Sequence, residues 1–267
     1  MSTTQQGAQS KRPLSGRHAL VTGGGRGIGE ATARALLDHG ARVTILGRDA
    51  GALAHTADAL RTSGAIGSVR ADVSDAESVA RAFTDARGQF GPIDILINNA
   101  GAAESAPFRT TDAALWRRMM AVNLDGTYHC IREALPAMAE SRWGRIVNIA
   151  STAGLAGYRY VSAYCAAKHG VIGLTRALAL ETATLGITVN AVCPGYADTD
   201  MTTRTIQNIV ARTGATPAEV LARLTAQNPQ NRLVTPGEVA HAVVWLCVPG
   251  SEAITGQAIA VAGGEVT

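Results

Sequence analysis

Two side chains able to exchange a proton lie four residues apart in an apolar segment, residues 162–185, that is expected to be a helix. They are Tyr164 and Lys168, and on a helix this spacing brings their Cβ atoms within about 5–6 Å of each other. A neighbouring ammonium favours the phenolate and is expected to lower the pKa of Tyr164 towards neutrality. The pair therefore suits general acid catalysis on a carbonyl, and general base catalysis in the reverse direction.

A third polar side chain, Ser151, directly follows residues 145–150, which are expected to form a strand. Its hydroxyl is then expected at the carboxyl end of that strand, where open α/β sheets bind their ligands. Ser151 is therefore a candidate ligand-binding residue.

A glycine-rich turn follows the first expected strand, residues 19–22. It reads Thr-Gly-Gly-Gly-Arg-Gly-Ile-Gly over residues 22–29. Between a strand and a helix, such a turn presents backbone N–H groups and a helix N-terminus to a pyrophosphate. The run predicts a nucleotide-binding site, with a purely structural turn as the alternative.

The second expected strand, residues 43–46, ends in Gly47 and Arg48. NAD sites carry an acid at this strand end, whereas a guanidinium suits the 2′-phosphate of NADP. Arg26, in the glycine-rich turn, is placed to contact the same phosphate from the other side. The sequence favours NADP(H), with NAD(H) as the alternative if a shift in register makes Asp49 the acid.

Strand-like and helix-like segments alternate along the chain. The expected strands are residues 19–22, 43–46, 93–97, 146–149 and 187–192, and the expected helices are residues 28–39, 51–62, 76–87, 112–140 and 162–185. This alternation predicts a parallel sheet covered on both faces. We expect one domain over residues 14–267 after a flexible arm at 1–13. A polar, helix-prone region at about 198–231 is expected to cover the ligand, or else to be a surface excursion.

The composition excludes several classes of protein. Aromatic residues make up 4% of the 267 residues and the net charge is only +3, which argues against a nucleic-acid-binding surface. No apolar run approaches the roughly 20 residues of a membrane span. The four cysteines are widely spaced and the histidines lack ligand spacing, so we expect no disulfide framework and no metal. A cytoplasmic protein is the expectation.

The motifs, taken in order, resemble the short-chain dehydrogenase/reductase family from about residue 14 to the C-terminus. The matching residues are the turn at 22–29, Asn98-Asn99-Ala100-Gly101, Asn123, Ser151, Tyr164, Lys168 and Pro194-Gly195. The resemblance implies an α/β fold: a single doubly wound Rossmann-type domain with a mostly parallel seven-stranded sheet. It also implies a homotetramer, which pairs the helices at 112–140 and 162–185 across one interface and the last strand, near 257–262, across another.

The resemblance also implies residue roles. Tyr164 would be the acid/base, Ser151 would hold the substrate oxygen, and Lys168 would bind the nicotinamide ribose and depress the pKa of Tyr164. Asn123 would hold a water in a proton relay to Lys168. The expected cofactor contacts are Gly23, Gly25, Arg26, Gly27, Ile28, Gly29, Arg48, Asp72, Val73, Asn99, Ala100, Gly101, Tyr164, Lys168, Pro194, Gly195, Ala197 and Thr199.

The leading hypothesis is an NADP(H)-dependent carbonyl reductase or secondary-alcohol dehydrogenase. A 3-oxoacyl carrier-protein reductase is the first alternative, but that group shows a basic residue where this chain has Leu185, although Arg142 could supply another. The second alternative is a catalytically silent, nucleotide-binding regulator. The intact catalytic residues argue against it.

The substrate is expected to be small and apolar, aromatic or of 3-oxoacyl type. Three tyrosines among the candidate residues suggest this, although Tyr158 and Tyr160 could instead pack a loop or a subunit interface. The candidate pocket residues are Ala103, Leu155, Tyr158, Tyr160, Tyr196 and Met201.

Overall fold

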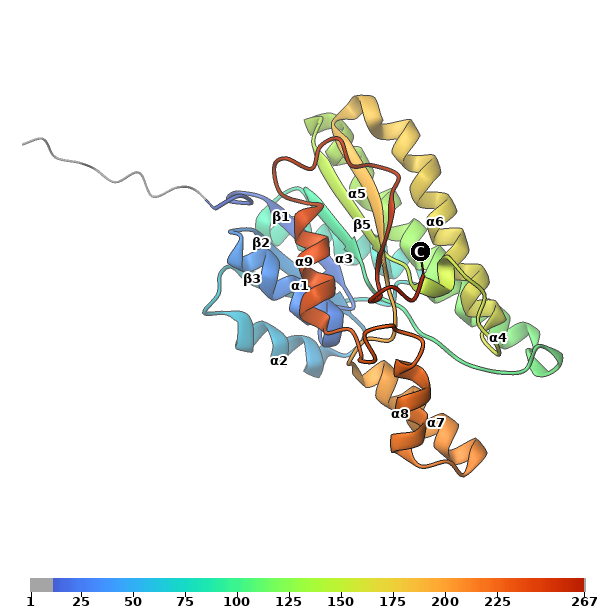
Figure 1. Ribbon diagram of the computed structural model, residues 1–267. Coiled ribbons are helices and arrows are strands. Elements are labelled where there is room, and N and C mark those ends of the chain that lie inside the picture. The colour runs from blue at the N-terminus through green and yellow to red at the C-terminus, as the bar shows by residue number, and fades with distance from the viewer. Residues whose placement is uncertain (1–11, 267) are drawn as a thin grey trace, which may run out of the picture.

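The computed structural model describes residues 12–266, in which a seven-stranded sheet carries helices on both faces (Figure 1). The sheet order is β3-β2-β1-β4-β5-β6-β7, and every neighbouring pair is parallel. This confirms the predicted doubly wound α/β fold. The strands are β1 (His18–Thr22), β2 (Arg42–Gly47), β3 (Ile66–Arg70), β4 (Ile95–Asn98), β5 (Gly144–Ile149), β6 (Ile187–Pro194) and β7 (Ala258–Val261).

The helices pack in two layers. Helices α1, α2 and α9 cover one face of the sheet and pack against it through Leu36, Leu60 and Val243. Helices α3 and α5 cover the other face through Phe83 and Ile131. Strands covered on both sides are buried along their whole length, as β1, β4 and β6 are, and apolar residues predominate in them beside a few buried polar ones such as His18, Asn98 and Asn190. The helices are α1 (Gly27–Asp38), α2 (Ala50–Leu60), α3 (Ala76–Phe90), α4 (Ala113–Met120), α5 (Gly126–Ser141), α6 (Ser162–Thr182), α7 (Asp200–Thr213), α8 (Pro217–Thr225) and α9 (Pro236–Trp245).

Side-chain caps fix where several helices begin. Asp75 accepts from the backbone of Glu77 and Ser78 at the start of α3. Thr235 forms a reciprocal capping box with Glu238 at the start of α9, with a proline at the first helical position. These local signals place the helix starts next to the strand ends that carry the candidate site.

The region after β4 departs from the prediction of one helix over 112–140. The structure divides it into α4, a π-helical turn over Ala121–Asp125, and α5. The side-chain amide of Asn123 donates to Met119 O at 2.9 Å, which competes with the regular backbone ladder. The result is an irregular turn at Asn123, and such π-turns recur at functional sites.

The polar region between β6 and α9 is helical, as expected. It forms α7 and α8, which project from the sheet in Figure 1. The arm expected at residues 1–13 lies almost wholly outside the described residues.

Candidate active site

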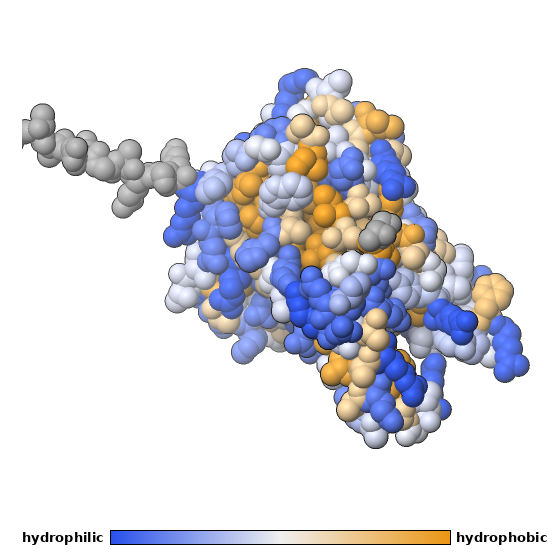
Figure 2. Space-filling model, viewed as in Figure 1, coloured by the Kyte–Doolittle hydropathy of each residue, from blue (hydrophilic) through white to orange (hydrophobic). Residues whose placement is uncertain are grey.

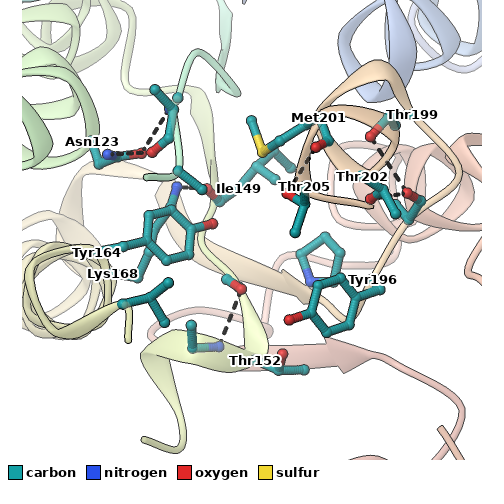
Figure 3. Close-up of a pocket in the computed structure, with 18 of the residues that line it drawn as sticks. Asn123, Ile149, Thr152, Tyr164, Lys168, Tyr196, Thr199, Met201, Thr202 and Thr205 are labelled. Atoms are coloured by element: carbon teal, nitrogen blue, oxygen red, sulfur yellow. Dashed lines mark hydrogen bonds between the residues drawn. The ribbon is translucent and has the colours of Figure 1, made fainter. Parts of the chain in front are cut away.

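Four side chains from three segments of the chain line one cavity of about 200 Å³. Asn123 comes from the π-helical turn, Ser151 follows β5, and Tyr164 and Lys168 come from α6. In Figure 3, Tyr164 and Lys168 lie side by side, with Tyr196 and the α7 residues across the cavity. The fold thus brings together side chains that lie up to 45 residues apart in the sequence.

Lys168 is held at the inner end of the cavity. Its side chain is buried, and Nζ donates a hydrogen bond to Ile149 O at 2.8 Å. Nζ lies 5.7 Å from the centre of the Tyr164 ring. Burial lowers the pKa of Lys168 to about 8, because the ammonium loses hydration in this environment.

Tyr164 responds to burial in the opposite sense. Burial raises its pKa to about 12, and a hydrogen bond with the Ser151 hydroxyl offsets part of that increase. The expectation that Lys168 brings the pKa of Tyr164 towards neutrality is therefore wrong for this arrangement. Helical spacing predicted the proximity of the two groups, but desolvation of the phenolate by burial is the largest influence on this pKa.

Asn123 is fully buried and uses its amide to fix the loop after β4. Nδ2 donates to Ala102 O at 2.9 Å, and Oδ1 accepts from Ala102 N at 3.3 Å. A Cβ atom on Gly101 would lie 2.9 Å from Asn123 Oδ1 and 3.7 Å from Lys168 Nζ. Glycine at position 101 therefore keeps open the space between the asparagine and the lysine.

The glycine-rich turn forms a cradle that side chains would fill. Gly23 and Gly27 have positive φ values of 64° and 56°, and a Cβ on Gly29 would overlap Gly23 O. Asn99 supports the turn by donating from Nδ2 to Thr22 O at 2.9 Å. Within the described chain, α1 has no side-chain cap at Arg26, so its first N–H groups remain available to an anion. The cradle fits a dinucleotide pyrophosphate.

The end of β2 carries a cation rather than an acid. Arg48 follows the strand directly, and its Nη1 lies 3.8 Å from Asp72 Oδ2. Asp49 instead caps α2, with Oδ1 accepting from Ala52 N at 3.1 Å. Nη1 of Arg26 lies 3.6 Å from Oδ2 of Asp200, at the start of α7.

The structure places the expected cofactor residues in two groups. One group lines the cavity, and the other lies outside it on the glycine-rich turn and at the ends of β2, β3 and β4. The lining group is Ile28, Asn99, Gly101, Tyr164, Lys168, Pro194, Gly195, Ala197 and Thr199. The outer group is Gly23, Gly25, Arg26, Gly27, Gly29, Arg48, Asp72, Val73 and Ala100.

Four of the six expected substrate residues line the cavity: Ala103, Tyr158, Tyr196 and Met201. Leu155 and Tyr160 do not, which corrects that expectation. Tyr160 is 61% exposed with a positive φ of 69°, and its carbonyl accepts from Ala106 N at 2.7 Å. Its backbone thus braces the neighbouring loop while its ring faces solvent.

The sequence did not single out some of the residues at the site. Thr202, Thr205 and Asn208 line the cavity from α7 at helical spacing, so this face could have been found from the period of the helix. Glu265 also reaches the site through a hydrogen bond from the Tyr158 hydroxyl. No local pattern signals that contact, because the two residues are 107 positions apart.

Residues 12–266 contain no helix long and apolar enough to cross a membrane. The same residues contain no group of three or more His, Cys, Asp or Glu residues arranged to hold a metal ion.

The family model for short chain dehydrogenases matches residues 17–210. The chain is 42% identical to cis-4-hydroxycyclohexanecarboxylate dehydrogenase of Sinomonas cyclohexanicum, over 93% of this chain and 96% of the relative. It is 41% identical to 2-(S)-hydroxypropyl-CoM dehydrogenase 3 of Xanthobacter autotrophicus, over 91% and 94%.

Among solved structures, the chain is similar to a variant of actinorhodin polyketide ketoreductase crystallised with NADPH. The TM-score is 0.90 and the identity 38%, with 93% of this chain and 97% of that one covered. With its parallel sheet, its glycine-rich cradle and these matches along most of its length, the chain belongs to the short-chain dehydrogenase/reductase family of oxidoreductases.

Proposed function

We propose that this oxidoreductase interconverts a ketone and a secondary alcohol with NADP(H), using Tyr164 as the general acid/base. The observation that carries the proposal is the convergence of Asn123, Ser151, Tyr164 and Lys168 on one cavity. NADPH, when bound, supplies the hydride. The glycine-rich turn and Arg48 would hold its phosphates, and Lys168 its nicotinamide ribose.

The residues of the chain handle the oxygen and its proton. Ser151 is placed to donate to the carbonyl oxygen, and Tyr164 to give that oxygen its proton as negative charge develops there. The raised pKa of Tyr164 keeps the phenol protonated at neutral pH, in the form that reduction requires. The ammonium of Lys168 then stabilises the phenolate that remains.

The choice of NADP(H) is supported by Arg48 and by the position of Asp49. A guanidinium binds a 2′-phosphate with several parallel hydrogen bonds. Asp49 instead caps α2, where its carboxylate accepts a hydrogen bond from the backbone. A carboxylate at this position stabilises the start of a helix. The similar ketoreductase was crystallised with NADPH, which points the same way.

A small apolar substrate is supported by the cavity walls. Ala102, Ala103, Val161 and Met201 contribute apolar surface to them. Docking of a carrier protein has less support, because Arg142 donates from Nη2 to Thr184 O at 2.6 Å and Leu185 is uncharged. We therefore favour a free ketone of aromatic, cyclic or 3-oxoacyl type over a carrier-bound one.

The test is NADPH oxidation with purified protein and a panel of aromatic ketones, cyclic ketones and 3-oxoacyl thioesters. We expect turnover with at least one class, and more with NADPH than with NADH. NADPH binding without turnover of any ketone would instead favour the silent, nucleotide-binding alternative.

A further inference from the structure

The end of the chain turns back onto the active-site cavity. After β7, Gly263 and Gly264 have positive φ values of 62° and 95°, and Glu265 N donates to Ala262 O at 3.2 Å. Two consecutive residues in the left-handed region make a tight reversal that glycine permits without strain. The reversal brings the Glu265 side chain to the cavity.

The Glu265 carboxylate lies directly behind two residues of the cavity wall. Its Oε1 accepts a hydrogen bond from the Tyr158 hydroxyl. Its other oxygen, Oε2, lies 2.5 Å from where a Cβ on Gly195 would be, so the carboxylate approaches closely because residue 195 has no side chain. Both Tyr158 and Gly195 line the cavity. The carboxylate thus lies in contact with the cavity wall, behind these two residues.

The negative charge of Glu265 has no counter-ion in the described part of the chain. No Lys, Arg or His nitrogen there approaches its carboxylate within 4.0 Å, whereas Glu104, the other acid beside the cavity, lies 3.1 Å from Arg118. Lys168 is the one cation among the lining residues of this cavity in the described chain. Its ammonium donates a hydrogen bond to Ile149 O and lies beside the Tyr164 ring.

Two tyrosines of the wall respond to this charge. Burial raises the pKa of Tyr158 and of Tyr196, and the proximity of Glu265 raises both further. The Tyr158 hydroxyl also donates a hydrogen bond to Glu265. Towards other groups it therefore presents only acceptor lone pairs and the carbons of its ring. An anionic group against this wall would therefore meet like charge and an acceptor.

We infer that Glu265 determines specificity, and that its unpaired carboxylate makes the cavity select neutral ketones over ketones that carry a carboxylate or phosphate. The inference rests on the proposed ketone reduction. Burying an anion without a partner is costly, and bringing it next to a like charge adds to that cost. The same wall accepts an uncharged amide, ester or ring of similar size.

The test compares two ketones that differ in charge and hardly in shape: 4-oxocyclohexanecarboxamide and 4-oxocyclohexanecarboxylate. For each, kcat/KM is measured with NADPH for the wild type and for the Glu265→Gln, Tyr158→Phe and Glu77→Gln variants. Glu265→Gln removes the charge, whereas Tyr158→Phe removes the hydrogen bond and leaves the charge. Glu77→Gln is the control for net charge, since Glu77 is 88% exposed on α3.

We expect the wild type to prefer the amide, and Glu265→Gln to raise the carboxylate-to-amide ratio about tenfold, equivalent to about 1.4 kcal/mol. Tyr158→Phe and Glu77→Gln should leave that ratio within about twofold, whatever they do to the absolute rates. Thermal melting of each variant establishes that it is folded.

The outcomes separate the inference from the proposed function. Turnover of the amide with an unchanged ratio in Glu265→Gln overturns the inference alone, and so does an equal increase in Tyr158→Phe, which would mean a structural effect. If the wild type reduces neither ketone while it binds NADPH, the proposed substrate class fails and the inference fails with it.

Discussion

The Nζ atom of Lys168 lies 5.7 Å from the centre of the Tyr164 ring, one turn along α6, and burial moves the pKa values of the two groups in opposite directions. The pKa of Tyr164 rises to about 12 and that of Lys168 falls to about 8. At pH 7 the phenol is protonated and the lysine charged, as ketone reduction requires. Between pH 8 and pH 12, the lysine loses its charge while the phenol keeps its proton.

The first prediction is the pH profile of reduction. The folded pKa of Lys168 is below its ordinary value, so the ammonium is present below about pH 8 and is lost above it. We expect kcat for reduction to be level at neutral pH and to fall above about pH 8. Lysine-selective carbon labelling checks the assignment, because the chain has only two lysines, Lys11 and Lys168. The NMR signal missing in Lys168→Met should titrate near pH 8, and titration near 10.4 would contradict the prediction.

The second prediction concerns stability. A lysine with a lowered folded pKa destabilises the native state at any pH below that pKa, and this cost disappears above its unfolded pKa. Lys168→Met removes the buried charge and keeps similar side-chain volume, so we expect the free energy of unfolding to rise by about 1–3 kcal/mol at pH 7. Urea denaturation at pH 7 and pH 10.5 measures it. The gain should shrink at the higher pH, and an equal gain at both would exclude titration as its cause.

The third prediction assigns proton transfer to Tyr164. Tyr164→Phe keeps the ring and removes only the hydroxyl, so we expect the rate of reduction to fall at least about 100-fold. NADPH affinity, followed by fluorescence titration, should change by less than about threefold. A variant that retains a tenth of the wild-type rate would rule out this role for Tyr164.

The sequence predicted the parts of this molecule that depend on local pattern. Buried β-branched runs located β1, β2, β4, β5 and β6, because strands covered on both faces are rich in apolar residues. β3 was not among them, since the edge strand Ile66–Arg70 is partly exposed and contains glycine and serine. The π-helical turn was also missed, because it arises from hydrogen bonds of one side chain, Asn123, that leave no mark on hydrophobic periodicity.

Contacts between residues far apart in the chain could not be predicted from a single sequence. The approach of Glu265 to Tyr158 depends on how β7 ends and on a glycine reversal, and nothing near either residue signals it. The predicted direction of the Tyr164 pKa shift was wrong for the same reason. Spacing reveals a neighbouring charge, whereas the burial that raises this pKa is a property of the folded chain.

The fourth prediction concerns the choice of cofactor. We expect Arg48→Ala to raise KM for NADPH about tenfold and to leave KM for NADH within about twofold, since only NADPH carries the 2′-phosphate. Arg61→Ala is the matched control, because Arg61 is similarly exposed (75%, against 68% for Arg48) and pairs with Asp58 at the far end of α2. A wild-type enzyme that prefers NADH would contradict the proposal and turn attention to Asp49.

The last prediction is the oligomeric state. Leu180 is 84% exposed on α6, and β7 is partly exposed at the edge of the sheet. Figure 2 shows hydrophobic side chains gathered over the region of α9 and the C-terminal segment. Exposed apolar surface of this kind, and an uncovered strand edge, are usually buried by a symmetry-related copy. We expect light scattering at micromolar concentration to give about 110 kDa, four times the 27.5 kDa of one chain.

A charged substitution distinguishes the two surfaces. Leu180→Glu places a carboxylate on the α6 face and leaves the β7 edge intact, so we expect it to reduce the assembly to a dimer of about 55 kDa, twice the 27.5 kDa of one chain. Its circular dichroism should match that of the wild type, because the side chain makes little contact within the subunit. A wild-type mass of 27.5 kDa would refute the tetramer, and an unchanged mass in the variant would exclude the α6 face as an interface.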